Sequence, residues 1–252
     1  MIRKIGALLS GTLIGRDTGE ILMKNLLLSL ILLIVSMAGA LAQTAPDEKV
    51  AAPQVQDLGN QRYRIGEIEI DKAKGEFRVS GRVLRDAPPL EFVVVTQGGH
   101  KAYEALLEVN ADAFQFNLAC ILIGLDASLA DPGHITDMNQ PVKGDPVEIS
   151  VSWLDGGKNI TVNASDLLVV GEPAQRVESQ DWVYTGSLTL DDGRYFADLS
   201  GTLIGFVHRQ ETIIEHKQGI GLGNYGSVNV NRDIAPPVGT QIELIVRRSK
   251  PI

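Results

Sequence analysis

The stretch DPVEISVSWLDGGKNITV, residues 145–162, decides the fold. Apolar residues occupy every second position over Val147–Trp153, and the alternation resumes over Ile160–Val162. This period is typical of a strand that buries one face. Between the two runs, Gly156-Gly157 supplies the positive φ angles that a tight turn needs. The stretch therefore predicts an antiparallel hairpin.

Similar strand patterns lie on both sides of this hairpin. Residues 62–83 alternate in the same way and predict two strands joined by a turn around Lys72–Gly75. Residues 181–200 predict a second hairpin that turns at Asp191–Gly193. The remaining predicted strands are apolar runs at 92–96, 201–208 and 240–248. Antiparallel strands therefore dominate the expected fold.

One segment has helical spacing instead. Large apolar residues recur three and four positions apart and predict one buried helix face. They are Phe114, Leu118, Ile121, Leu122 and Leu125. Ala119 and Cys120 fill much of the opposite side, so we expect the rest of the fold to cover both sides. The predicted class is α+β, mostly antiparallel β with one strong central helix at about 111–125.

The N-terminal residues carry a targeting signal. Residues 23–42 combine a short basic start, an apolar run and a small-residue motif that ends at Ala42, which predicts a secretory signal peptide. Because such a peptide normally begins at the initiator, residues 1–22 are interpreted as a gene-model extension. Residues 43–60 are rich in Ala, Pro and Gln and predict a flexible tether. A single domain is expected over residues 61–248.

Localisation and partner class follow from the same features. We expect an exported protein, periplasmic or extracellular, with no stable membrane span after signal cleavage. The apolar run of the signal is shorter than the roughly 20 residues that cross a bilayer; an uncleaved N-terminal anchor is the alternative. The net charge of −8 disfavours nucleic acid and anionic lipid as partners. Cys120 is the only cysteine, and its apolar neighbours predict a buried thiol.

Three motifs resemble functional sites but lack the required context. Gly221–Gly226 spells GxGxxG, yet the residues after it alternate like a strand, whereas a dinucleotide site needs a helix there. The segment His208–His216 contains two His and two Glu without HExxH spacing, and we expect a solvated polar edge. Thr185–Ser187 has no nearby His to act as a base. We therefore predict no catalytic residue, no cofactor and no metal ligand.

The stretch TQGGHKAYEALLEV, residues 96–109, groups polar side chains behind two glycines. Gly98-Gly99 lets a strand end in a sharp turn, and the chain re-enters the core near Leu106. Lys101 and Glu104 are expected to form an ion pair at the rim of this turn. The candidate recognition surface consists of His100, Lys101, Tyr103 and Glu104. A catalytic set with His100 as base is the alternative, although no second cluster supplies a nucleophile or an oxyanion donor.

Five blocks of the sequence occur in a familiar order. They are PPLEFVVVTQGGHKAYEALLEV (88–109), FNLACILIGLD (116–126), GDPVEISVSWLDGGK (144–158), WVYTGSLTL (182–190) and APPVGTQIELIV (235–246). In order and spacing they resemble the YdjY domain, a family found in exported bacterial proteins, over about residues 59–248. The resemblance implies a bacterial source, export and one domain. It implies no reaction, because no activity is established for the family.

The resemblance also marks individual positions. They are Lys101, Glu104, Gly124, Trp153, Trp182, Gly186, Ser187, Ala197, Asp198, Gly201, Gly239 and Thr240. Many relatives have His before the Glu, where this chain has Tyr103, and this departure weakens a metal-binding role for the pair. Some relatives carry a ferredoxin-like label, but one cysteine cannot ligate an iron–sulfur cluster.

These observations predict a non-enzymatic exported domain that binds an unknown envelope protein or a small ligand. The alternative is a metal- or redox-accessory protein of the periplasm that uses His100, Tyr103 and Glu104.

Overall fold

The predicted hairpin is present as strands β7 (Asp145–Asp155) and β8 (Lys158–Asn163), which pair antiparallel. The two turn glycines have φ angles of 54° and 82°, in the region that favours glycine. The four alternating apolar residues of β7, from Val147 to Trp153, are all buried. The prediction for this stretch is confirmed.

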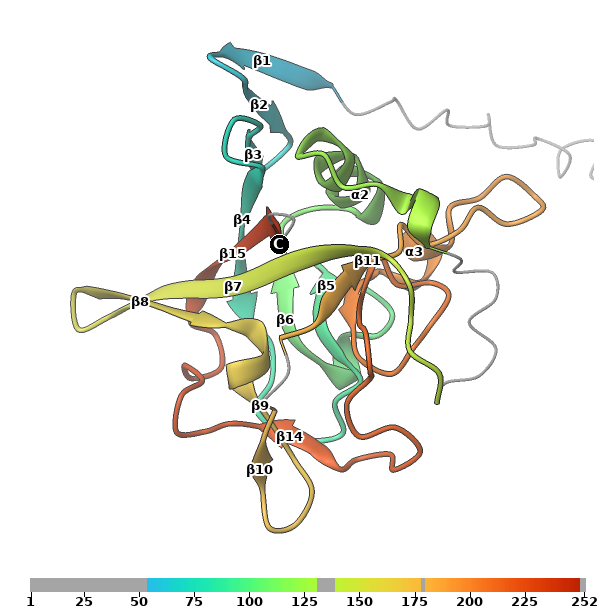
Figure 1. Cartoon of the computed structure of the whole chain (residues 1–252). Helices are drawn as coiled ribbons and strands as arrows, with labels where there is room; N and C mark the ends of the chain where they lie inside the picture. The colour runs from blue at the N-terminus through green and yellow to red at the C-terminus, as the bar shows by residue number, and fades with distance from the viewer. Residues whose placement is uncertain (1–53, 131–138, 178–179, 250–252) are drawn as a thin grey trace, which may run out of the picture. The chain divides into compact units, whose positions relative to one another are not determined.

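The computed structural model describes residues 54–130, 139–177 and 180–249 (Figure 1). The predicted extension and signal peptide, and the tether up to residue 53, lie outside the described residues.

Eight strands close into a barrel, which forms the larger part of a twelve-stranded sheet. In order around the barrel they are β4 (Glu76–Val83), β15 (Gln241–Arg248), β7, β11 (Trp182–Tyr184), β13 (Ile214–His216), β12 (Thr202–Gly205), β5 (Phe92–Thr96) and β6 (Ala105–Val109). Pairing of β6 with β4 completes the ring. All neighbours are antiparallel except β12–β13 and β5–β6, which are parallel.

The predicted α+β class is wrong. Strands make up 41% of the structure and helices 13%. Among the described residues, only one helix is seven residues or longer. The fold is therefore mostly β. Periodicity identifies single strands, whereas the β4–β6 pairing that closes the barrel joins two segments that have strand β5 between them in the chain.

The N-terminal part of the fold contains two more strands than predicted. Strands β1 (Val55–Gly59), β2 (Arg62–Ile65) and β3 (Ile68–Asp71) form a meander that leads into β4. Within the described residues, β1 contradicts the predicted tether. Every residue of β1 is exposed, so the strand has no buried face to produce an alternating pattern.

The helix α2 (Ala113–Leu122) covers one end of the barrel and is shorter than predicted. Its N-terminus is capped by Asp112, whose side chain accepts a hydrogen bond from the Gln115 amide at 2.6 Å. Phe116 packs edge-to-face on Phe77 of β4, with ring centroids 5.1 Å apart. No helix in the described part of the chain is long and apolar enough to cross a membrane.

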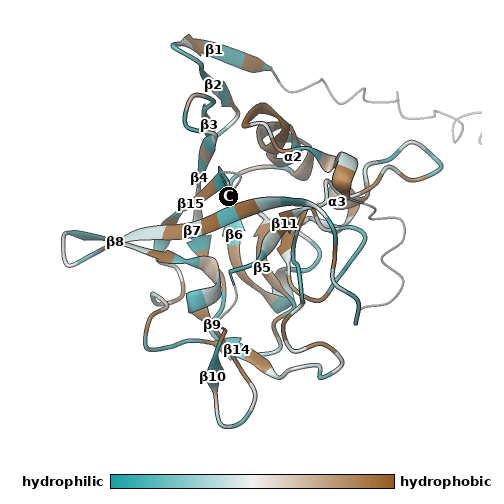
Figure 2. Ribbon diagram, in the orientation of Figure 1, coloured by the Kyte–Doolittle hydropathy of each residue, from teal (hydrophilic) through white to brown (hydrophobic). Residues whose placement is uncertain are grey.

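The predicted orientation of α2 is wrong. The face against the barrel carries Ala113, Phe116, Ala119 and Cys120, which are buried. Phe114 and Ile121, predicted to be buried, are 46% and 51% exposed. Both sides of the helix are apolar (Figure 2), so hydrophobicity alone could not choose between them. The small residues let the helix backbone approach the barrel closely.

The predicted second hairpin does not form as a hairpin. After β11, the chain makes a single bridge between Thr189 and Tyr195 and then enters the short helix α3 (Phe196–Ser200). Gly201 ends α3 at φ 73°, a left-handed cap. Helix α3 lies beside α2 at the same end of the barrel (Figure 1).

A small second sheet lies at the opposite end of the barrel (Figure 1). It contains β10 (Gln175–Arg176), β9 (Leu168–Val170) and β14 (Val228–Val230) in that order. The preceding 3-10 turn (Ala164–Leu167) is fixed to the barrel through Ser165, whose hydroxyl accepts the indole hydrogen bond of buried Trp182 at 3.1 Å. Val228 of β14 also lines the hollow of the candidate site, so the site reaches this end of the barrel.

Candidate functional site

Residues 97–104 form a crossover between two parallel strands. Because β5 and β6 run in the same direction, the chain must return along the barrel before β6 begins. Gly98 makes the first turn at φ 70°, and Gly99 packs so closely on Gly201 that a Cβ there would lie 3.1 Å from the Gly201 carbonyl oxygen. The crossover covers a small apolar cluster of Phe92, Val95 and Ala105. The glycine turn is confirmed, but the strands that it joins are parallel.

The predicted ion pair forms at the end of the crossover, within and next to the 3-10 turn Ala102–Glu104. Lys101 Nζ lies 2.8 Å from Glu104 Oε1. The side chain of Glu104 is only 3% exposed and that of Lys101 is 29% exposed. The expectation that Glu104 lies at the rim is therefore wrong. The hydrogen bond to Glu104 raises the pKa of Lys101, and partial burial opposes that rise.

Two tyrosines contact this ion pair. The hydroxyl of Tyr225, from the loop between β13 and β14, donates to Glu104 Oε2 at 3.4 Å. On the other side, Lys101 Nζ donates to the hydroxyl of Tyr103 at 3.3 Å. As whole residues, Tyr103 and Tyr225 are nevertheless 56% and 67% exposed. Partial burial and the charge of Glu104 raise the pKa of Tyr225.

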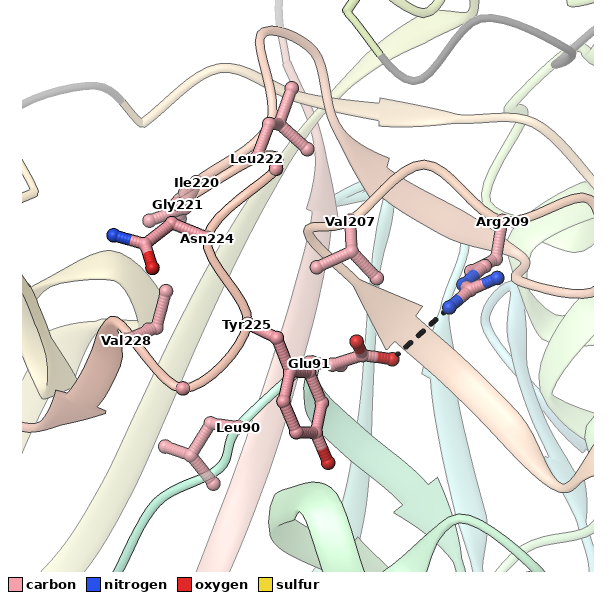
Figure 3. Close-up of a pocket in the computed structure, with 12 residues that line it drawn as sticks. Leu90, Glu91, Val207, Arg209, Ile220, Gly221, Leu222, Asn224, Tyr225 and Val228 are labelled. Atoms are coloured by element: carbon pink, nitrogen blue, oxygen red, sulfur yellow. Dashed lines mark hydrogen bonds and ion pairs between the residues drawn. The ribbon is translucent and has the colours of Figure 1, made fainter.

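A hollow of about 230 Å³ opens beside Tyr225 (Figure 3). Its apolar lining comes from Leu90, Val207, Ile220 and Val228. Glu91 and Arg209 form a second ion pair in its wall, with Oε2 and Nη2 3.4 Å apart. The amide of Glu91 also donates to the Glu104 carbonyl at 2.9 Å, which joins this wall to the crossover. We call the exposed faces of His100, Lys101, Tyr103 and Tyr225, with this hollow, the crossover surface.

The glycine motif Gly221–Gly226 contributes to the hollow, not to a dinucleotide site. Strand β14 follows it, so there is no helix N-terminus to face a pyrophosphate. The hollow is also below the range of about 300–1,000 Å³ typical of ligand pockets.

The sequence matches a protein-family model over most of the fold. The model of the YdjY domain matches residues 68–247. The chain belongs to the YdjY domain family. The matched range includes the whole crossover and the hollow and excludes strands β1 and β2. No match to the chain is found among curated proteins or among solved structures.

A buried carboxylate holds part of the wall of the hollow in this YdjY domain in place. Glu215 of β13 is 0% exposed and accepts hydrogen bonds from the amides of Arg209, at 2.8 Å, and His208, at 3.3 Å. Burial raises the pKa of Glu215 to about 8, although these hydrogen bonds oppose the rise. Glu215 thereby holds the turn that carries Arg209.

The predicted solvated edge at residues 208–216 is wrong. His208 and His216 are each 2% exposed, and His208 Nε2 lies 2.9 Å from the His216 carbonyl oxygen. The segment folds back on itself because His208 adopts φ 58°, which a strand reading cannot anticipate. His216 packs edge-to-face against Trp182, with ring centroids 5.1 Å apart.

Among the described residues of the YdjY domain, no group of three or more His, Cys, Asp and Glu side chains is arranged to hold a metal. His100 is exposed on the crossover. Cys120 is buried in α2, as predicted, and burial raises the pKa of its thiol well above the usual value.

The positions marked by the family lie at several places in the domain. Lys101 and Glu104 form the ion pair of the crossover. Gly124, Ala197, Asp198 and Gly201 lie at the α2 end, where Asp198 accepts a hydrogen bond from the Phe114 amide at 3.0 Å. Trp153 and Trp182 are buried in the barrel core, and the hydroxyl of Ser187 donates to the Glu211 carbonyl at 3.0 Å. Gly239 lies in a turn, and Gly186 and Thr240 lie in loops outside the helices and strands. Most marked positions therefore support the fold.

Sequence reasoning missed Tyr225, Glu91 and Arg209. These residues are far from the crossover in the sequence, with Tyr225 121 positions beyond Glu104. Tyr225 lies inside the glycine motif Gly221–Gly226, whose sequence resembles only a nucleotide-binding motif and does not indicate a contact with the crossover.

Proposed function

We propose that this YdjY domain is an exported, non-enzymatic binding domain that recognises a segment of an envelope protein at the crossover surface. The observation that carries the proposal is that two exposed tyrosines are linked to one buried carboxylate, Tyr225 directly and Tyr103 through Lys101. Glu104 receives Lys101 on one oxygen and Tyr225 on the other, and Lys101 in turn contacts Tyr103. This arrangement holds two aromatic rings in place before any partner arrives.

Preorganised aromatic residues favour protein recognition. Tyrosine offers a large apolar face and a polar tip with few rotatable bonds, and it is enriched at binding interfaces. The adjacent hollow, with its apolar lining and one ion pair, has room for a single side chain of a partner. A catalytic function would need a nucleophile or a general base in reach of bound substrate. On this surface, Glu91, Glu104, Lys101 and Arg209 are all engaged in ion pairs.

A crosslinking experiment tests the proposal. A photoreactive phenylalanine analogue is placed at Tyr103 or Tyr225 in cells, with Leu154 as control because it is 72% exposed at the tip of the β7–β8 hairpin. We expect the same envelope protein to be captured from positions 103 and 225 and not from 154. No capture, or equal capture from all three positions, would reject the crossover surface as the binding site.

Affinity for the captured protein then measures the contribution of the rings. We expect Tyr103→Ala to weaken binding at least about tenfold, as for an interface hot spot. Its effect on the free energy of unfolding should stay within about 0.5 kcal/mol, because the residue is mostly exposed. Leu154→Ala is the matched control and should change neither quantity.

Export is a separate expectation that rests on the signal-peptide pattern. We predict that the mature chain begins at Gln43, directly after the motif that ends at Ala42. Mass spectrometry of the protein purified from a bacterial envelope fraction measures the N-terminus. Recovery of protein that still begins at Met23, or that stays in the cytoplasm, would contradict the prediction.

A further inference from the structure

The outer face of α2 carries an apolar stripe that is only partly covered, by Tyr195, which packs edge-to-face on Phe114 with ring centroids 6.4 Å apart. Phe114, Leu118 and Ile121 lie four and three positions apart, on one side of the helix. Phe114 and Ile121 are about half exposed, and Leu118 is partly exposed. Figure 2 shows the hydrophobic colour on this helix, in a protein with a net charge of −8. A contiguous apolar patch on such a surface is typical of an interaction site.

The two ends of the stripe carry opposite charges. At the N-terminal end of α2, Asp112 and Asp198 are exposed, and their carboxylates accept hydrogen bonds from the first amides of the helix. At the C-terminal end, Arg248 is exposed and its guanidinium donates to the Gly124 carbonyl at 3.4 Å. The stripe is therefore acidic at one end and basic at the other.

We propose that the stripe binds a second copy of this chain, with the two α2 helices antiparallel across a twofold axis. A twofold interface places the same patch on both subunits, so the patch must be self-complementary. In the antiparallel arrangement, Leu118 meets its own counterpart near the axis, and Phe114 faces Ile121 of the partner subunit. The acidic end of each stripe then lies opposite Arg248 of the partner subunit.

Charge favours this arrangement over a parallel one. Parallel helices would place Asp112 and Asp198 opposite the same carboxylates of the second copy, and like charges in contact repel. The overall charge of −8 per chain also opposes self-association, but salt screens charges beyond about 8 Å at physiological ionic strength. The proposed contacts between opposite charges at the ends of the stripe are shorter than this distance, so salt screens them only weakly.

Disulfide trapping of the full mature chain tests the arrangement. Leu118→Cys should form an intermolecular disulfide under mild oxidation, because the two copies of this position meet at the axis. Leu154→Cys, at an exposed position outside the stripe, should not. The native Cys120 is buried and does not compete. Efficient self-crosslinking of Phe114→Cys instead of Leu118→Cys would mean a parallel pair and would overturn the proposal.

Sedimentation velocity measures the association without a crosslink. The wild-type chain should form dimers as its concentration rises, and Ile121→Glu should raise the dissociation constant at least about tenfold. Arg248→Glu should also weaken the dimer, whereas Leu154→Glu should leave it unchanged. A wild-type chain that is monomeric at all concentrations and gives no Leu118→Cys crosslink would reject the second copy.

Two further results would assign the stripe to another occupant and overturn the proposal. One is an adduct, formed from a photoreactive residue at position 121, to a peptide from residues 43–53 of the same chain. The other is binding of monomers to phosphatidylcholine vesicles that is lost in Ile121→Glu. Because the stripe and the crossover surface share no residue, the dimer and the proposed partner binding fail independently.

Discussion

The free energy of unfolding is expected to fall as the pH rises from 5 to 9, and Glu215→Gln is expected to remove most of that fall. Burial raises the pKa of Glu215 from an ordinary value of 4.5 to about 8 in the folded state. Between these two values the unfolded chain ionises Glu215 and the folded chain keeps it protonated, so rising pH favours unfolding. Stability from this group is complete below pH 4.5 and is lost as the pH rises through 8.

The size of the effect follows from linkage. One pKa unit corresponds to about 1.4 kcal/mol, so the loss between pH 5 and pH 9 is about 3–5 kcal/mol. Urea unfolding of wild type and Glu215→Gln at pH 5, 7 and 9 measures the difference. Glutamine keeps the shape of the side chain but cannot ionise. Its side-chain nitrogen, however, cannot accept the hydrogen bond that the His208 backbone amide donates to Glu215. We therefore expect a constant cost from the lost hydrogen bond and a much flatter pH dependence.

Glu211→Gln is the matched control for this experiment. Glu211 lies in the same turn and is only partly buried, and its charge is a minor cause of the raised pKa of Glu215. Its replacement should leave the pH dependence close to that of the wild type. If wild type and Glu215→Gln lose stability in parallel with rising pH, Glu215 is already ionised in the folded protein and the prediction is wrong.

The strands could be predicted from the sequence where their pattern is local. The β7–β8 hairpin needs only alternating residues and two glycines, and both are visible within residues 145–162. The run that forms β5 is similarly clear, since all but its last residue is buried. The closed barrel could not be predicted, because β4 pairs with β6 and with β15, and the residue pattern of a single strand does not indicate which strands it pairs with.

Helix α2 shows a different limit. Hydrophobic periodicity identifies a buried face only when the other face is polar. Here Phe114 and Ile121 compete with Phe116 and Cys120, and packing selects the side with smaller residues. Exposed Phe114 and Ile121 are then predicted as core, although they belong to the surface proposed for self-association.

Only the part of the candidate site whose residues are neighbours in the sequence could be predicted. The polar group at 100–104 and its ion pair follow from nearby letters in the sequence. The burial of Glu104 depends on Tyr225 and on the strand that begins after Glu91, which the barrel brings from elsewhere. Sequence position alone cannot distinguish an ion pair at the rim from one whose carboxylate is covered by a distant loop.

Lys101→Met is expected to lower the free energy of unfolding by about 2–3 kcal/mol. Removal of one partner from a buried ion pair typically costs about 3–5 kcal/mol, because the remaining charge is buried without compensation. Glu104 is 3% exposed and would keep only the Tyr225 hydroxyl, at 3.4 Å. The cost should be below that range because Lys101 is 29% exposed, which implies that water reaches part of the pair. Chemical denaturation at pH 7 measures the loss.

A double-mutant cycle separates this ion pair from one at the surface. Glu104→Gln leaves a lysine that can turn into solvent, so it should cost less than Lys101→Met, and the two changes together should cost less than their sum. We expect a coupling energy of about 1.5–3 kcal/mol. The exposed pair of Arg194 and Asp192, whose side chains are 60% and 50% exposed, is the control and should give less than about 1 kcal/mol. An equally small coupling for Lys101 and Glu104 would mean that the carboxylate is hydrated in solution. In that case the pair could not hold Tyr103 and Tyr225 in place, and the structural basis of the proposed crossover surface would be lost.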